Sequence, residues 1–532
     1  MPDQLPPVTV AVLGVVPTRP NPSAPSSTKP RCPWAEADLA RLELADHWIL
    51  AVELPASVAR DAGGTEVTRA TNVLVIVLDA LREDAVEPSL EEPGRCFKAK
   101  SCISAAPWTL PSCTSLISGL DTTRHRHYWH SDAAVASDLV RCVPAGYSKV
   151  GLVNNTVLLP ASGLNAGFDR WTHFDDHRQP FERAASLIRR ARRRKPLFLL
   201  LHSNIAHDYY RRGADAYYDE AFPSAPGEAY MLGDKVIGWS GTTPEERVAA
   251  AKTYRASAMK AVAYAREVLD LVRARDDFVS VIVSDHGEGL DYDGARIHHG
   301  GRLHDDLLRV PLYFDLPSTI PQSQSSDMAA ALASTPVAMT DVLPTVLALA
   351  GVASIPSVDG CRIGTAPDGR LVVSEDRRYL YLNDRFRLNV KGRGKNMSRL
   401  DREQNELLLG QLAGPPILRS YRSDAAKLIM TCLHLRSGTG TPSDDRRSLL
   451  KLGERLLGSP VLFLRGNRMF AFELYDLDGD PTERHNLLAA GGDGVEALRA
   501  SPWATSVTMP IGDETDDTEV HLPTMLEEAE RI

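Results

Sequence analysis

Acidic and histidine side chains follow three apolar runs of the chain, at positions where they could hold a metal ion. The set comprises Asp79, His202, His207, Asp285 and His286. Hard divalent cations favour carboxylate oxygens, and borderline metals also accept imidazole nitrogens. One Asp after an apolar run is commonly a turn or a helix cap. Several acids and histidines in equivalent places predict a site for a divalent cation.

The apolar runs themselves predict buried strands of an α/β sheet. They cover residues 73–78, 150–153, 197–201, 278–283 and 310–314. Helical spacing predicts a helix over residues 245–275 and another over 341–350, which Gly351 closes. Strands that alternate with helices predict a mostly parallel central sheet flanked by helices. Ligands collect beyond the carboxyl ends of such strands, where the polar side chains lie.

A chain of 532 residues is too long for one hydrophobic core. We expect an N-terminal extension with a Pro/Ser-rich linker, a catalytic α/β domain, a smaller C-terminal α+β domain and an acidic tail. Their expected bounds are residues 1–70, 71–355, 356–510 and 511–532. Short strands are expected at residues 8–16, 371–374, 379–382 and 469–475, and a short helix at 35–47.

Composition excludes several classes of protein. A formal net charge of −9 argues against nucleic-acid binding, and the basic run at 189–195 is interpreted as a solvated helix end. No apolar stretch approaches the roughly 20 residues of a membrane span, so no membrane association is expected. The seven cysteines include no CxxC pair, and no basic segment precedes residues 8–16, so a cytoplasmic protein is expected. Oligomeric state is not defined by the sequence.

An ordered set of motifs resembles the sulfatase / alkaline phosphatase superfamily. The motifs run from residue 72 to residue 487 in the family's order: NVLVIVLDALRED (72–84), APWTLPSCTSLISG (106–119), LHSNIAHDYY (201–210), SDHGEG (284–289), HHGGRLHDDLLRVP (298–311), DVLPTVLALAG (341–351) and LYDLDGDPTERHNL (474–487). The resemblance implies an alkaline-phosphatase-like fold and a hydrolase acting on ester bonds.

The resemblance also assigns roles to individual residues. Asp79, Asp285 and His286 match metal ligands for a divalent ion, which could be Ca, Mn, Zn or Mg. Thr109 matches the nucleophile that also contacts the metal. The remaining positions are histidines that bind the transferred group or assist the leaving group, and a cation that neutralises the anion: His207, His299 and Arg302, the last with a spacing that differs from the family's. Glu288 is expected to be structural.

The residues around Thr109 agree with a nucleophile. Thr109 precedes Pro111 and a predicted helix from Ser112. The N-terminus of a helix presents N–H groups and the positive end of its dipole to an anionic ester. A bound divalent cation would lower the pKa of the hydroxyl and polarise the ester oxygens. Alone, a threonine here would more commonly be a helix cap.

Two positions depart from the family pattern. Ala80 stands where many sulfatases have a second metal-binding Asp, and Cys113 stands where the family has an Arg four residues after the nucleophile. The missing Arg, together with Thr at the nucleophile position, argues against a formylglycine-type sulfatase.

We therefore predict a metal-dependent hydrolase of small anionic esters, most readily phosphate mono- or diesters or phosphonate esters, with Thr109 as nucleophile. One alternative is a sulfuric ester hydrolase without formylglycine. The motifs also fit a phosphoryl transferase, because the covalent intermediate is shared, and a degenerate member that binds an anion without turnover. His125, His127 and His130 could form a metal site, but their interpretation as part of a surface loop is favoured.

Overall fold

The computed structural model describes most of residues 71–210, 244–377, 416–434 and 461–489, with short gaps, as well as the backbone of 58–60 and 66–68 and several residues after 497. The chain divides into two compact units, Met1–Leu54 and Pro55–Ile532. All of the described residues belong to the second unit. The strand expected at 8–16, the linker and the helix expected at 35–47 lie outside the described residues.

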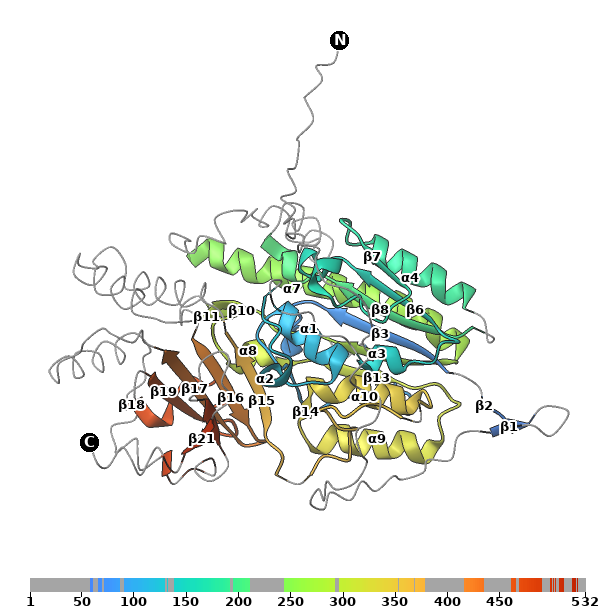
Figure 1. Ribbon diagram of the computed structural model, residues 1–532. Helices are drawn as coiled ribbons and strands as arrows, with labels where there is room; N and C mark the ends of the chain where they lie inside the picture. Colours follow the sequence, from blue (N-terminus) through green and yellow to red (C-terminus); the bar gives the residue numbers. More distant parts are fainter. Residues whose placement is uncertain are drawn as a thin grey trace, which may run out of the picture. The chain divides into compact units, whose positions relative to one another are not determined.

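A seven-stranded sheet forms the centre of the described chain (Figure 1). In order across the sheet its strands are β4 (Cys96–Lys98), β13 (Leu312–Asp315), β9 (Phe278–Val283), β3 (Asn72–Leu78), β8 (Leu197–Ser203), β6 (Ser148–Val153) and β7 (Arg170–His173). The five strands from β9 to β7 are parallel, whereas β13 and β4 are antiparallel to their neighbours. The predicted mostly parallel sheet is confirmed.

Helices cover both faces of this sheet, as Figure 1 shows. Side chains of a strand alternate between faces, so Val73 and Val75 lie in one core and Leu74 and Ile76 in the other. The first core contains residues of α1 and α10, and the second contains residues of α4 and α7. These helices are α1 (Thr109–Ser118), α10 (Met339–Leu349), α4 (Gln179–Arg190) and α7 (Pro244–Arg275). The helices expected at 245–275 and 341–350 are α7 and α10.

One predicted strand is wrong. Residues 310–314 form two strands rather than one, because β12 (Arg309–Val310) ends before Pro311 and β13 begins after it. Proline has no N–H to donate to a sheet ladder. The chain therefore changes sheets at Pro311, and β12 pairs with β5 (Cys102–Ile103), which also pairs with β14 (Val337–Ala338).

A second, antiparallel sheet forms the C-terminal part. Its strands in order are β15 (Val372–Asp376), β16 (Ile417–Arg422), β17 (Ala426–His434), β19 (Arg468–Asp476) and β18 (Val461–Arg465). The strands expected at 371–374 and 469–475 correspond to β15 and β19, and the one expected at 379–382 lies outside the described residues. The α/β fold class with a smaller C-terminal domain is confirmed. β15 joins the central α/β part through Glu375 N, which donates to Ala105 O at 2.9 Å, and Ser374 Oγ, which donates to Ser104 O at 2.6 Å.

Apart from α9, the remaining elements are short. They are β1 (Val58–Arg60), β2 (Glu66–Thr68), α2 (Thr122–His125), α3 (Asp138–Cys142), α8 (Asp305–Leu308), α9 (Gln322–Ser334), β10 (Gly289–Asp291), β11 (Arg296–His298), β20 (Thr508–Pro510), β21 (Glu519–His521) and the 3-10 turns Glu83–Ala85, Thr156–Leu158, Pro160–Ser162, His207–Tyr210 and Leu487–Ala489. Within the described residues, no helix combines the length and apolarity that a membrane crossing needs.

The histidines after α1 are not on a surface loop. His125 and His127 are buried, and their rings bond to Ser115 Oγ and Thr114 Oγ1 of α1, each at 2.9 Å. The surface-loop interpretation is therefore wrong for these two residues. His130 lies outside the described residues.

Candidate active site

Three neighbouring strands deliver the predicted metal ligands to one edge of the sheet. β9, β3 and β8 are adjacent, and their carboxyl ends point the same way because they are parallel. Asp79 follows β3, Asp285 follows β9 and His202 lies near the end of β8. The backbone N–H of Asp79 donates to Ser203 O at 2.9 Å, which continues the pairing of β3 with β8.

Asp79, Asp285 and His286 meet in the interior. One potential ligand atom from each lies within 4.8 Å of the other two. His286 Nε2 is 3.3 Å from Asp79 Oδ1 and 3.8 Å from Asp285 Oδ2. All three side chains are fully buried. The structure thus brings together the three residues that the sequence proposed as ligands.

The turn after β3 fixes Asp285. Ala80 has a left-handed backbone with φ 59°, an uncommon conformation for a residue with a Cβ. In this conformation its N–H donates to Asp285 Oδ1 at 3.2 Å. The position that carries a second acid in many sulfatases here supplies a backbone hydrogen bond instead.

His286 is oriented by its backbone surroundings. Its Nδ1 lies 2.7 Å from Gly287 O, so Nδ1 carries the hydrogen and Nε2 presents a lone pair when the ring is neutral. Gly287 is required at its position, because a Cβ there would lie 2.1 Å from Asp306 O. The imidazole therefore faces the two carboxylates with the nitrogen that could bind a metal.

Thr109 lies at the same point. It is the first residue of α1, and its Oγ1 is 3.3 Å from both Asp79 Oδ2 and His286 Nε2. Helix α1 is held against the loop after β9 by Ser112, whose Oγ donates to Asp285 O at 2.6 Å. The N-terminal turn of α1 is thereby fixed beside the carboxylates.

The two predicted substrate histidines stack beside His286. Ring centroids are 4.6 Å apart for His286 and His299 and 4.9 Å apart for His299 and His207. His299 Nδ1 is 2.9 Å from the buried Glu288 Oε2. Glu288 therefore contacts the ring of His299 and can fix its orientation, and its structural role stays a prediction.

Arg302 has a partner that the sequence did not predict. Its guanidinium forms a two-point ion pair with Asp306, with Nη2 at 2.6 Å from Asp306 Oδ2 and Nη1 bonded to Oδ1. The pair joins residues four apart at the start of α8. A role for Arg302 in neutralising a substrate anion therefore remains a prediction. It requires the guanidinium to bind the anion and the Asp306 carboxylate at the same time.

Three further residues belong to the site. Asn155 Nδ2 donates to Asp79 Oδ2 at 2.7 Å, and His202 Nε2 is 3.6 Å from the nearest oxygens of Asp79 and Asp285. Asp208 Oδ1 is 2.9 Å from His207 Nδ1. Asn155 follows the predicted strand at 150–153, so the same signal of polar groups at strand ends could have found it.

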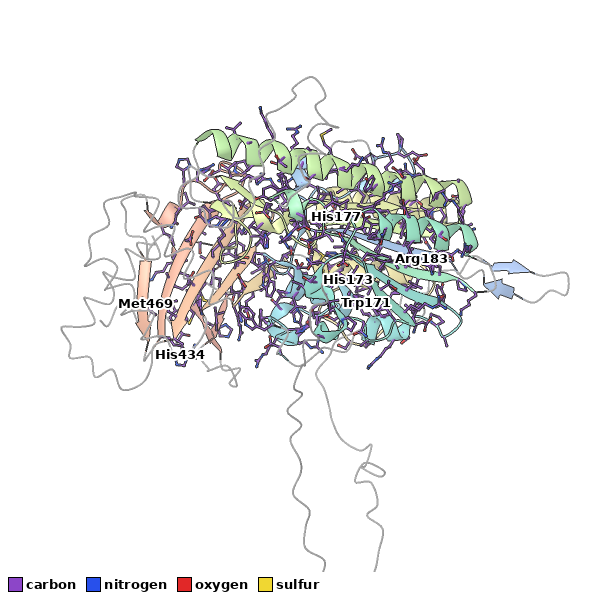
Figure 2. All side chains as sticks on the ribbon, turned by 90° about the horizontal axis from the view of Figure 1, so that it is seen from above. Trp171, His173, His177, Arg183, His434 and Met469 are labelled. Atoms are coloured by element: carbon purple, nitrogen blue, oxygen red, sulfur yellow. The ribbon has the colours of Figure 1, made fainter. Side chains whose placement is uncertain are left out.

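Asp208 also connects His207 to the outer part of the molecule. Its Oδ2 lies 3.6 Å from Nε2 of His177, which is labelled in Figure 2. The Asp208 side chain is 2% exposed and that of His177 is 24% exposed. The carboxylate therefore lies between an inner and an outer imidazole.

Electrostatics of the cluster favour a cation. Burial opposes ionisation of Asp79, but the nearby His207, His286 and His202 hold its pKa well below its usual range. Burial likewise disfavours a charged His286, but Asp285 and Asp79 outweigh it and raise its pKa to about 9. Both shifts favour positive charge between the two carboxylates, which a divalent ion would supply in place of a proton on His286.

The residues fit such an ion. Asp79 Oδ1 is buried, and among the described residues it accepts no hydrogen bond. This oxygen, His286 Nε2 and an oxygen of Asp285 lie close together, so all three could bind the same ion. Carboxylate oxygens and an imidazole nitrogen are donors that divalent metal ions accept in proteins.

Comparison with known proteins defines the class. Residues 97–352 match the Sulfatase family model, a segment that includes Thr109, Asp285 and His286 and begins after Asp79. This match and the fold described above show that the chain is similar to proteins of the sulfatase family, as the sequence motifs predicted. The enzyme class expected from the sequence, a hydrolase acting on ester bonds, is that of the sulfatase family.

Individual relatives are distant. A low-salt glycan biosynthesis sulfotransferase of Haloferax volcanii is 26% identical over 324 residues, which cover 58% of this chain and 66% of that protein, slightly less than two thirds of its length. A 2-O GAG sulfatase has a TM-score of 0.51 at 17% identity, over 81% of this chain and 89% of its own. A protein of the Bacteroides thetaiotaomicron locus for metabolism of glycosaminoglycans has a TM-score of 0.53 at 14% identity, over 79% and 92%. These structures show the fold.

Proposed function

We propose that the chain is a metal-dependent hydrolase of small anionic esters in which the Thr109 hydroxyl is the nucleophile. The observation that carries this proposal is the position of Thr109 Oγ1, 3.3 Å from Asp79 Oδ2 and 3.3 Å from His286 Nε2. A hydroxyl between a carboxylate and an imidazole, at the first turn of a helix, is placed to bind a metal and to attack an anion.

The chain's own groups account for each step of a phosphoryl transfer. Thr109 Oγ1 forms a bond to phosphorus, the bond to the leaving alkoxide breaks, and the hydroxyl proton passes to solvent, because the Asp79 carboxylate is assigned to the ion. His207 or His299 donates a proton to the leaving oxygen and then accepts one from the incoming water. Water attacks phosphorus, the Thr109–phosphorus bond breaks, and the threonine oxygen regains its proton. When bound, the ion supplies Lewis acidity and lowers the pKa of the hydroxyl.

Phosphate mono- and diesters and phosphonate esters are the proposed substrates. Formylglycine serves in sulfatases because its hydrate has two hydroxyls, one that attacks sulfur and one that expels sulfate by breaking a carbon–oxygen bond. Threonine has a single hydroxyl. Its sulfate ester can be cleared only by a second attack at sulfur, whereas its phosphate ester is open to metal-assisted attack by water at phosphorus.

Sulfuryl chemistry is the second candidate, and the relatives favour it. The family model is that of sulfatases, and one structural neighbour, with a TM-score of 0.50 at 12% identity, was crystallised with its substrate D-glucosamine-2-N,6-O-disulfate. The Haloferax volcanii relative is named a sulfotransferase. In a transferase the alcohol of an acceptor replaces water in the second step, while Thr109 keeps its role as nucleophile.

Intact-mass measurement of acid-quenched enzyme tests the proposal. The enzyme, supplied with zinc or manganese, is mixed separately with nitrophenyl phosphate, bis(nitrophenyl) phosphate, a nitrophenyl phosphonate and nitrophenyl sulfate. We expect turnover and an adduct with the phosphorus esters, and neither in Thr109→Ala. Thr114→Ala is the matched control, since Thr114 lies on the same helix but bonds to His127.

An adduct and turnover with the sulfate ester alone would overturn the phosphoryl assignment in favour of the sulfuryl one. If adding an alcohol raised release of nitrophenol and produced the new ester, transfer would replace hydrolysis as the second step. Full activity in Thr109→Ala would refute the nucleophile itself.

A further inference from the structure

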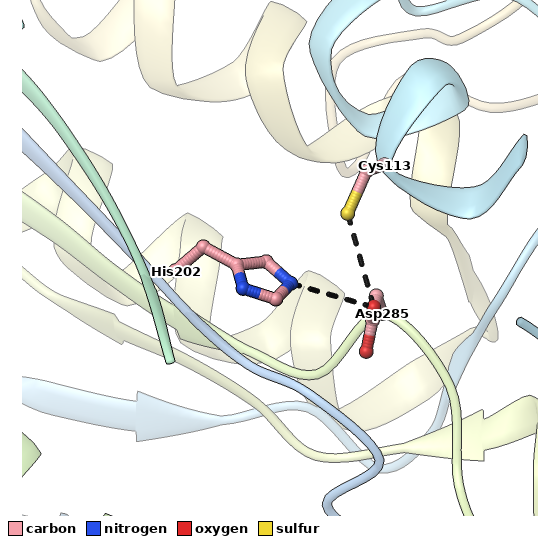
Figure 3. Close-up of side chains that lie close together, drawn as sticks. All are labelled: Cys113, His202 and Asp285. Atoms are coloured by element: carbon pink, nitrogen blue, oxygen red, sulfur yellow. Dashed lines mark hydrogen bonds and ion pairs between the residues drawn. The ribbon is translucent and has the colours of Figure 1, made fainter. Parts of the chain in front are cut away.

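A second group of metal-binding side chains adjoins the first. Cys113, His202 and Asp285 each place one potential ligand atom within 4.8 Å of the other two. Figure 3 shows the thiol and the imidazole pointing at the Asp285 carboxylate. Asp285 Oδ2 is 3.8 Å from Cys113 Sγ and 3.6 Å from His202 Nε2. All three side chains are buried.

The burial and hydrogen bonding of His202 indicate that its ring could bind a metal ion. The residue is 1% exposed, and among the described residues neither ring nitrogen has a hydrogen-bond partner. The 3.6 Å between its Nε2 and Asp285 Oδ2 is too long for a hydrogen bond. It is close to the separation of two ligands on one tetrahedral ion, about 3.4 Å for bonds of about 2.1 Å. A buried imidazole aimed at a carboxylate across this distance leaves room for an ion between them.

The two oxygens of Asp285 have different surroundings. Oδ1 accepts from the backbone N–H of Ala80 at 3.2 Å and of His286 at 2.9 Å. Those two bonds fix the carboxylate plane. Oδ2 is then presented to His202 and Cys113, and lies farther, at 3.8 Å, from His286 Nε2.

Cys113 replaces a cation in this position. The resemblance places the family's Arg here, next to the metal-site carboxylates, and this chain has a thiol instead. Two buried carboxylates, Asp79 and Asp285, thus lose a permanent positive neighbour. Buried charge without a counter-charge is strongly unfavourable. A metal ion held partly by the thiol would restore the positive charge that the arginine provided.

We propose that Cys113, His202 and Asp285 bind a divalent transition-metal ion at a position of its own, which shares Asp285 with the position formed by Asp79, Asp285 and His286. Sulfur, nitrogen and oxygen ligands together select zinc-like ions and exclude calcium and magnesium. The thiol loses its proton to solvent when the ion binds. This inference rests on the proposed function only in assuming that the oxygen-rich position also holds an ion.

The site would be joined directly to the nucleophile. Cys113 lies four residues after Thr109, on the same face of α1 and one turn along it. An ion held by Cys113 therefore anchors the first turn of α1 to the end of β9. Its coordinate bonds would reinforce the contact that the hydrogen bond between Ser112 Oγ and Asp285 O already makes.

Cobalt substitution tests the proposal without reference to turnover. The full chain is stripped with a chelator, titrated with cobalt(II) alone and followed by absorption spectroscopy and metal analysis. We expect two ions per chain and a near-ultraviolet thiolate-to-cobalt charge-transfer band. Cys113→Ser should lose the band and one ion. Cys102→Ser, in which another fully buried thiol is changed, should keep both.

His286→Ala distinguishes the two positions. This variant removes a ligand of the oxygen-rich position only, so the charge-transfer band should persist while one ion is lost. Absence of the band in the parent, binding of a single ion, or loss of the band in His286→Ala would each overturn the proposal. None of these outcomes bears on the covalent adduct at Thr109, so failure of this inference and failure of the proposed function are separable.

Discussion

Two carboxylates placed side by side in a protein interior determine the chemistry of this site at the scale of single residues. Asp79 and Asp285 have no exposed surface, and among the described residues their ion-pair partners are imidazole rings. Desolvated charge of this kind persists when it is paired or bound to a metal. The arrangement therefore favours a cation more strongly than any single ligand would.

Removing one carboxylate should reduce metal binding. Asp285→Asn keeps the shape of the side chain but removes a charged ligand, so zinc or manganese affinity should fall at least about tenfold, as it does when even outer partners of a metal site are changed. Asp315→Asn is the matched control. That carboxylate is also fully buried, but it pairs with Arg273 and Arg95 beside the start of β9, at the opposite end of the sheet. Equal metal content in Asp285→Asn and the parent would contradict the assignment.

Proton transfer by His207 should depend on Asp208. Burial lowers the pKa of His207, but Asp79 and the hydrogen bond to Asp208 outweigh burial and raise it above 6.5. A raised pKa keeps the ring protonated to higher pH, so activity that needs this proton is lost as pH rises through it. Asp208→Asn should move the alkaline limb of the kcat/KM profile to lower pH, because the bond that raises the pKa of His207 is weakened. Asp176→Asn, at an exposed carboxylate near His177, should leave the profile unchanged.

The sequence predicted the residues of this site better than their partners. Asp79, Thr109, Asp285, His286, His207 and His299 come together as expected, because each lies at a strand end or in a motif. Asp208 and Glu288, which bond to the histidines, were not predicted to do so. Both pairs are close in sequence, but they depend on the backbone conformation of the turn at His207–Tyr210 and of the β10–β11 hairpin, which residue types and spacing do not specify.

At the scale of elements, helix α7 supports the turn that carries Asp79. Tyr254 of α7 donates its hydroxyl hydrogen to Ala80 O at 2.8 Å and accepts from Arg82 N at 2.8 Å. These bonds span the left-handed residue after β3. A helix on the face of the sheet thus holds the conformation that aims a backbone N–H at Asp285.

Removing that hydroxyl should weaken the turn. Tyr254→Phe leaves the buried Ala80 carbonyl and the partly buried Arg82 N–H without their partner, which should cost about 1–3 kcal/mol in the free energy of unfolding. Tyr313→Phe is the control, since Tyr313 is also buried but within the described chain its hydroxyl has no hydrogen-bond partner. Urea unfolding of both variants gives the comparison. Similar losses in the two would show that the Tyr254 bonds do not support the turn.

Strands were predicted well where both faces are buried. The continuous apolar runs of β3, β8 and β9 identified them, because only a sheet covered on both sides accepts such runs. β7 was missed because Arg170 and His173 interrupt its apolar pattern at the edge of the sheet. The division of residues 310–314 into two strands was also missed, although Pro311 was visible in the sequence.

At the scale of the molecule, a buried ion cluster joins the C-terminal sheet to the catalytic part. Asp305, at the start of α8, bonds to Arg422 of β16 at 2.6 Å and to Lys427 of β17 at 2.7 Å. Its backbone N–H donates to Glu483 Oε2 at 2.5 Å, and Lys427 Nζ is 2.9 Å from Glu483 Oε1. α8 follows directly after the segment that contains His299 and Arg302. The cluster therefore fixes the C-terminal sheet close to residues of the site.

Replacing Asp305 should destabilise this junction and change its response to acid. Burial raises the pKa of Asp305, but Lys427 and then Arg422 outweigh burial and lower it from 3.8 to about 2. A lowered pKa in the folded state means that this stabilisation is present above about pH 4 and is lost as pH falls toward 2.

Asp305→Asn leaves two buried cations with one acid fewer, so at neutral pH we expect a loss of about 3–5 kcal/mol in the free energy of unfolding measured in urea. The difference between the variant and the parent should shrink as the pH is lowered from 4 to 2, because the parent then loses the same interaction. Asp305→Asn combined with Lys427→Met, which removes one of the uncompensated cations, should recover part of the loss at neutral pH. A constant difference across this pH range, or no recovery in the double variant, would show that the charge of Asp305 does not hold the two parts together.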